Sequence, residues 1–285
     1  MPRKKNLFFT TPAFVAGILL LNLRPMIDKL FATHHFSSAE IVLMGTVNLI
    51  TFIPECMVLS TSYAIQSLSS QTEEHGKTFH YLAAGLGITL CILLPVLCSM
   101  SLFPTFFLKL VSSSSPSDSA SISFFRFRLL GCFFQCLIFC LRGFYAAHRN
   151  NRIFFSVIAI SLIIHTLLNL VLFSGHGWLP QIGIQGMGLS YGIAMLFGLS
   201  IYTEQLLRDM ATISFTLPTR TAYYKLLRVS IPLTLHGIID HIGTTLIFFC
   251  TGRFYGLLPL ASLHLVSRTQ GISPGAGFGL TALTE

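Results

Sequence analysis

The chain has 285 residues, of which 53% are hydrophobic and only 10% are charged, and its formal net charge is +8 at pH 7. Soluble domains carry about 25% charged residues, so this composition excludes an ordinary soluble protein. The apolar residues form near-continuous runs of about 20, the length that crosses a bilayer as a helix. We therefore predict an all-α integral membrane protein, and we assign the positive charge to membrane topology rather than to nucleic-acid binding.

The apolar runs predict eight membrane helices. With a cytoplasmic N-terminus, eleven Lys and Arg residues of the connecting segments and adjoining helix ends lie inside and five lie outside, among them Arg142 inside and Arg128 outside. The positive-inside rule then favours a multi-pass protein of the cytoplasmic membrane with its N-terminus in the cytoplasm. All seven cysteines fall within these spans, which predicts buried, reduced thiols rather than disulfides. The predicted helices are 7–31, 41–65, 79–110, 124–146, 152–174, 181–206, 227–251 and 255–281.

The longest connection, 207–226, is moderately basic and is predicted to be a cytoplasmic linker. It divides the chain into an N-terminal six-helix lobe, 1–206, and the start of a C-terminal lobe, 227–285, with two helices. The expected fold is therefore a six-helix bundle plus the first two helices of a second bundle.

The spacing of prolines supports this division. Pro12 and Pro54 are 42 residues apart, and so are Pro232 and Pro274, so a shift of 220 residues superposes both pairs. Parallel repeats of this kind recur in transporters, whose sites lie near the midplane between the halves. The offset predicts that a second copy starts near residue 227 and is incomplete after two helices.

An acid in the seventh predicted span, Asp240, is the main candidate functional residue. A charged side chain near the bilayer centre costs about 2.5–3.5 kcal/mol and usually faces a bundle interior or a wet cavity. His236 lies one turn before Asp240 on the same helix face, and His241 follows it. The group predicts a protonatable or cation-binding site. The alternative is an acid that a neighbouring helix satisfies without a transport role.

Two polar residues in the first lobe are secondary candidates. Asp28 lies late in the first span, with Arg24 one turn before it and Lys29 after it. It is either a second carboxylate facing the same cavity or the partner of Arg24 in an ion pair. Asn169 is a mid-helix amide that either hydrogen-bonds a neighbouring helix or contributes to a cation site.

The remaining patterns predict packing rather than chemistry. The glycines of 183–188 favour close contact between helices. Cys132, Cys136 and Cys140 form a stripe of small packing residues on one helix face. The chain has no nucleophile elbow, no phosphate-binding loop and no H-E-x-x-H zinc motif. We therefore expect no enzyme activity and no cofactor beyond Na⁺ or H⁺ as a coupling ion.

At these residues the chain resembles the MATE family, the multidrug and toxic compound extrusion transporters, in particular its NorM-like branch. The feature that carries most weight is a proline followed eight residues later by an acid, here Pro232 and Asp240. Other segments also resemble the family: Met26-Ile27-Asp28, Tyr63-Ala-Ile-Gln66, Leu168-Asn169, Gly186-Met-Gly-Leu-Ser190, Leu260-Ala-Ser-Leu-His264 and Gly277-Phe-Gly279.

The resemblance implies two six-helix bundles, of which this chain supplies one and the first two helices of the other. It also implies a secondary antiporter that extrudes amphipathic organic cations in exchange for Na⁺ or H⁺. In that function Asp240 is the coupling carboxylate, Asp28 and Asn169 are partners, and His236 or His241 tunes the acid. Arg24 and Lys29 beside Asp28 depart from the family pattern and favour Asp240 over Asp28.

Two alternatives stay open. Arg24 and Arg268 lie within predicted spans, which favours a lipid-linked oligosaccharide flippase of the same superfamily. A second lobe of only two helices favours a non-transporting remnant, or a chain that needs a completing subunit. The expected partners are small organic cations and membrane lipid, with no nucleic acid.

Overall fold

The computed structural model describes residues 7–72, 75–111, 118–148, 150–174, 182–210 and 218–267. All regular elements in these ranges are α helices. Six of them, α2, α3, α5, α6, α7 and α8, are long and apolar enough to cross a membrane. The helices are α1 (Leu7–His35), α2 (Ser38–Ser70), α3 (His75–Leu102), α4 (Pro104–Val111), α5 (Ser119–Ala147), α6 (Asn151–Ser174), α7 (Ile184–Met210), α8 (Arg220–Tyr255) and α9 (Leu257–Ser267).

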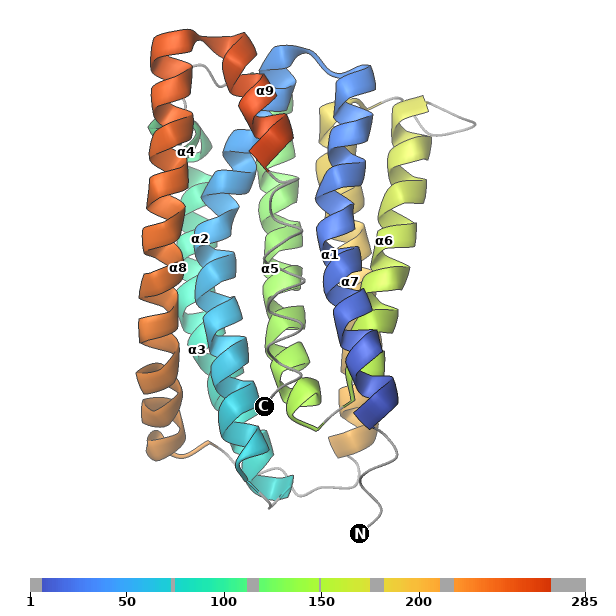
Figure 1. Ribbon diagram of the computed structural model, residues 1–285, viewed down its shortest axis with the longest axis vertical. Coiled ribbons are helices and arrows are strands. Elements are labelled where there is room, and N and C mark those ends of the chain that lie inside the picture. The colour runs from blue at the N-terminus through green and yellow to red at the C-terminus, as the bar shows by residue number, and fades with distance from the viewer. Residues whose placement is uncertain are drawn as a thin grey trace.

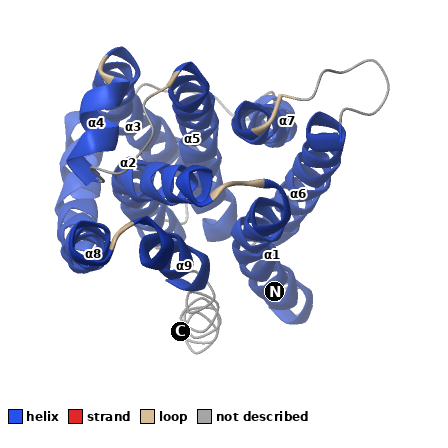
Figure 2. Cartoon of the chain, turned by 90° about the horizontal axis from the view of Figure 1, so that it is seen from above, coloured by secondary structure: helices blue, strands red, loops and turns tan. Residues whose placement is uncertain are grey.

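The long helices lie side by side in one bundle (Figure 1). Seen from above, α1, α6 and α7 occupy one side, α3, α4 and α8 occupy the other, and α2, α5 and α9 lie between them (Figure 2). Helix α5 packs against α2, α3 and α7, and α1 packs against α6. Helices α8 and α9 pack against α2. The predicted six-helix unit is thus present, and the two later helices lie against its α2 side.

Apart from shifts of up to five residues at several helix ends, the helices differ from the predicted ones in three places. The third predicted helix is broken at Phe103, because Pro104 lacks a backbone N–H and disfavours helical geometry in the residue before it. Helix α7 continues to Met210, and α8 begins at Arg220 behind the N-cap Thr219, so helix covers part of the predicted linker. The predicted eighth helix begins at Leu257, and its part beyond Ser267 lies outside the described residues.

Two expectations about individual side chains are wrong. The predicted topology counts Arg128 and Arg142 with the charged residues at the two membrane faces, but both are buried within α5. Without them the basic residues number ten inside and four outside, which leaves the preferred orientation unchanged. Cys91, Cys98 and Cys250 are exposed rather than buried, although all seven cysteines are free thiols. Exposure suits a thiol that faces lipid, since lipid tails are as apolar as a protein core.

The contact between α5 and α7 depends on glycine, as the glycines of 183–188 predict. Gly183 has a φ of +61°, which glycine adopts without strain, and α7 starts directly after it. A β-carbon at Gly188 would lie 2.9 Å from the carbonyl oxygen of Phe124 on α5. A side chain at this position would therefore push the two helices apart. This close approach fixes α7 against α5, where the polar groups described next are found.

Candidate functional site

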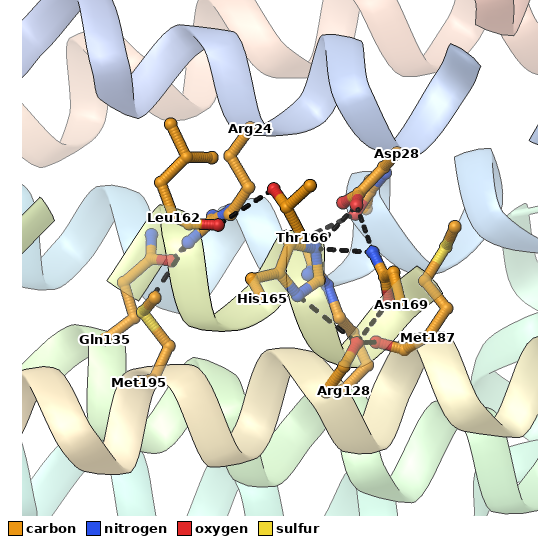
Figure 3. Close-up of polar contacts among 12 residues, drawn as sticks. Arg24, Asp28, Arg128, Gln135, Leu162, His165, Thr166, Asn169, Met187 and Met195 are labelled. Carbon is orange, nitrogen blue, oxygen red and sulfur yellow. Dashed lines mark hydrogen bonds and ion pairs between the residues drawn. The ribbon is translucent and has the colours of Figure 1, made fainter. Parts of the chain in front are cut away.

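Asp28 lies inside the six-helix unit and is only 7% exposed. Its carboxylate Oδ1 is 2.6 Å from Nε2 of His165, and Asn169 donates to the same oxygen from Nδ2 at 3.3 Å. His165 and Asn169 are one turn apart on α6, and both are fully buried. The structure therefore brings together two of the predicted residues, Asp28 and Asn169, across the contact between α1 and α6 (Figure 3).

A third helix completes the arrangement through Ser190 on α7. The Ser190 hydroxyl lies 3.2 Å from Nδ1 of His165, and it is also within hydrogen-bond distance of Oδ1 of Asn169 and of the Met187 carbonyl. We call Asp28, His165, Asn169 and Ser190 the Asp28 cluster. Hydrogen bonds within this cluster join α1, α6 and α7, so a change of charge here acts on three helices at once.

Two buried arginines lie beside the cluster. The guanidinium carbons of Arg24 and Arg128 are 4.5 Å and 3.6 Å from the centre of the Tyr191 ring. Arg24 donates to Oε1 of Gln135 at 2.9 Å. Buried guanidinium groups need partners, and here aromatic and amide groups supply them. Tyr191 in turn meets the His165 ring edge-on, with the ring centres 6.2 Å apart.

These contacts decide between the two interpretations of Asp28. An ion pair with Arg24 on the same helix is one of them. In the described part of the chain, Asp28 instead bonds to α6, and Arg24 bonds to α5. Asp28 is therefore a carboxylate held by neighbouring helices rather than one half of a local pair.

The Asp240 group lies elsewhere. The side chains of Asp240 and His236 are 72% and 78% exposed, and Nε2 of His236 is 3.8 Å from the carboxylate. Helix α8 contacts α2 through other residues. One of them is His241, whose ring stacks on that of Phe52 with the ring centres 4.3 Å apart. The prediction that Asp240 faces a bundle interior is thus not met by the described helices. His241 also points away from the acid, toward the Leu49 carbonyl at 2.8 Å.

The groups of the Asp28 cluster can bind and release a proton or a small cation. The carboxylate offers negative charge, the imidazole can gain or lose a proton, and the amide and hydroxyl can each reorient. Within the described ranges, no three His, Cys, Asp or Glu side chains are arranged to hold a metal ion. A proton or a single small cation fits such a set of groups.

The sequence contains signals for the residues that the prediction leaves out. His165 lies four residues before Asn169, so the two share a helix face. Ser190 belongs to the glycine-rich start of α7, where close packing brings polar side chains into contact with other helices. Arg128 gives no such signal, because it lies near the start of α5 and resembles an interfacial charge.

Several long apolar helices around a buried polar cluster define a polytopic membrane protein with ionisable groups in its interior. A family model described as MatE matches residues 12–171, which include Asp28, Asn169 and most of the six-helix unit. The chain belongs to the MatE family. A search of curated proteins finds no match.

Solved structures agree on the fold. The chain is similar to the MATE multidrug transporter DinF-BH, solved as a complex, with a TM-score of 0.81 and 16% identity. That match covers 99% of this chain and 64% of the DinF-BH chain. A MATE in complex with Br-NRF gives a TM-score of 0.70 at 14% identity, with 99% of this chain and 67% of the other covered. The Vibrio cholerae transporter VcmN in its bent form gives 0.69 at 15% identity, covering 98% and 64%.

The chain thus spans about 64% of the length of the first of these transporters. Helices α1 to α7 and the pair α8 and α9 all fall within the matched part, because nearly the whole chain is covered. At these identities the comparison establishes the fold.

Proposed function

We propose that the protein is a secondary antiporter that exchanges Na⁺ or H⁺ for amphipathic organic cations across the cytoplasmic membrane. The observation that carries the proposal is the buried carboxylate of Asp28, which His165 and Asn169 hold from a neighbouring helix. Ionisable groups within membrane segments are costly and mark ion pathways. The family and the fold point in the same direction.

The coupling follows from the position of the cluster. An ion can drive transport only if it binds one conformation more tightly than the other. The hydrogen bonds of the Asp28 cluster join three helices, so ion binding at the cluster changes the contacts that hold α1 against α6 and α7. We therefore propose Asp28 as the main coupling carboxylate, with Asn169 as its partner, in a protein whose N-terminus is cytoplasmic.

The test reconstitutes the purified chain into liposomes and follows ethidium fluorescence under an imposed pH gradient, an imposed Na⁺ gradient, or neither. We expect ethidium movement with one of the two gradients and little without them. Equal rates in all three conditions would contradict an antiport mechanism. No ethidium movement in any of them would leave the chain without transport activity of its own.

Asp240 remains a second candidate, with His236 and His241 beside it, and its expected effect is smaller. The exposed Asp240 carboxylate lies 3.8 Å from Nε2 of His236, apart from the Asp28 cluster. Asp240→Asn is therefore expected to weaken ethidium transport less than Asp28→Asn does, while coupling to the gradient persists. Loss of the gradient dependence in this variant would move the coupling role from Asp28 to Asp240.

The flippase alternative depends on basic residues that are free to meet pyrophosphate. Arg24 bonds to Gln135 and lies over the Tyr191 ring, and it is buried to 6% exposure. Arg268 lies outside the described residues. The contacts of Arg24 therefore favour a role inside the six-helix unit over one in binding a lipid headgroup.

A further inference from the structure

We propose that the coupling ion is a proton, and that it is taken up by the imidazole of His165 at Nδ1 while Asp28 stays ionised beside it. This inference rests on the proposed antiport function and names the ion and the residue that carries it. The argument comes from counting the hydrogens available to the Asp28 cluster.

The orientation of Asn169 is the first step. Its Nδ2 lies 3.3 Å from the Asp28 carboxylate, and its Oδ1 faces the Ser190 hydroxyl. The opposite orientation would place an amide oxygen against a carboxylate oxygen, two acceptors in contact. Asp28 therefore fixes Oδ1 of Asn169 as an acceptor toward Ser190.

The tautomer of His165 is the second step. Its Nε2 lies 2.6 Å from Asp28 Oδ1 and 3.2 Å from Nδ2 of Asn169. An ionised carboxylate can only accept, so a contact of 2.6 Å with Asp28 requires a hydrogen on Nε2, and the amide nitrogen, which can only donate, does not accept it. A neutral His165 thus carries its one hydrogen on Nε2, and Nδ1 is bare.

The third step concerns Ser190, which has one hydrogen to donate. Around its hydroxyl lie three acceptors when His165 is neutral: Nδ1 of His165, Oδ1 of Asn169 and the Met187 carbonyl. A proton on Nδ1 turns the ring into a donor to Ser190, and the hydroxyl is then released to Asn169 or Met187. The cluster therefore has a place for one more hydrogen, and that place is Nδ1.

The surrounding charges allow this uptake. Among the described residues, Arg24 on α1 and Arg128 on α5 contribute two positive charges, and Asp28 contributes one negative charge. Glu55 on α2 contributes another negative charge, which acts on Arg128. Tyr191 on α7 is the titratable group that faces His165 from that helix. The fixed charges of the four ionised groups cancel, so these groups and His165 together carry a net positive charge only when His165 is protonated.

A positively charged His165 repels an organic cation bound within the six-helix unit, whereas a neutral His165 does not. This gives the proton and the substrate the mutual exclusion that exchange requires. A Na⁺ ion at Oδ1 would instead compete with the two donors on that oxygen, and at either carboxylate oxygen the charges of Arg24 and Arg128 would oppose it. The geometry thus favours the proton.

The test observes protonation directly, in purified protein with ¹⁵N-labelled histidine rings. Nitrogen chemical shifts distinguish an imidazolium from each neutral tautomer. His165→Gln identifies the His165 signals, and His34→Gln, at the exposed end of α1, is the matched control. If His165→Gln fails to fold, Ser190→Ala identifies the same signals, because it removes the partner of Nδ1.

On acidification, we expect Nδ1 of His165 to change from bare to protonated while Nε2 stays protonated throughout. The contrary result is an Nδ1 that remains bare, together with an infrared band of a protonated carboxyl group that Asp28→Asn removes. Transport is measured separately on the same preparation. A titrating His165 without gradient-driven ethidium transport would uphold the protonation and defeat the antiport function. Gradient-driven transport with an Nδ1 that stays bare would uphold the antiport function and defeat the protonation of His165.

Discussion

Asp28→Asn is expected to abolish ion-coupled ethidium transport while the protein still inserts and folds. The asparagine keeps the size of the side chain and one acceptor oxygen for His165, but it removes the negative charge that balances the ring. Removing one partner of a buried charge pair costs about 3–5 kcal/mol. At about 1.4 kcal/mol per factor of ten, this corresponds to a loss of about 100-fold or more in affinity for the coupling ion.

The measurement is gradient-driven ethidium transport in liposomes, with the elution volume on size exclusion as the check on folding. Glu204→Gln is the matched control, because Glu204 is exposed and pairs with Arg208 one turn away on α7. The control variant should transport like the unaltered protein. Normal gradient-driven transport by Asp28→Asn would exclude Asp28 as the coupling carboxylate.

Gly188→Ala is expected to destabilise the protein by about 1–3 kcal/mol, as overpacking typically does. The new β-carbon would lie 2.9 Å from the Phe124 carbonyl oxygen and 3.1 Å from the β-carbon of Phe127, so α7 must move away from α5. That movement would also displace Ser190, which lies two residues further along α7. Thermal unfolding in detergent, followed by the loss of monodisperse protein, measures the effect.

Gly243→Ala gives the comparison for this variant. Gly243 lies within α8, and a β-carbon there would have no heavy atom within 4 Å among the described residues. Alanine favours a helix over glycine by about 1 kcal/mol, so this change should leave the midpoint unchanged or raise it slightly. Equal thermal-unfolding midpoints for Gly188→Ala and Gly243→Ala would show that the contact between α5 and α7 is looser than described.

The helices can be predicted from the sequence because each depends on local patterns. Apolar runs locate α2, α5 and α6 within a few residues, and Ser37 with Glu40 forms a capping box at the start of α2. The prediction misses the break at Phe103, although Pro104 signals it, because the apolar run continues through it. It misses the early start of α8 because polar residues precede the apolar part of that helix.

The candidate site is only partly predictable, because it depends on contacts between distant helices. Asp28 and His165 are 137 residues apart in sequence, and no local pattern shows that α1 packs against α6. The neighbouring Arg24 makes an ion pair on one helix an equally good interpretation of Asp28. Burial of Arg24 against Gln135 and Tyr191 removes that partner. The free-energy cost of placing an acid within a membrane helix favours Asp240 as the main candidate. In the structure, however, the Asp240 side chain is exposed on the surface of α8.

The measurement that tests the central claim most directly counts the protons released when ethidium binds to the purified protein. It uses a pH indicator in a weakly buffered detergent solution, just below the pH at which His165 loses its proton. If the Asp28 cluster exchanges a proton for the substrate, about one proton should leave for each ethidium bound, by the reciprocity of linked binding. Asp28→Asn should release none. Binding without proton release in the unaltered protein, or equal release by Asp28→Asn, would contradict the exchange of a proton at this cluster.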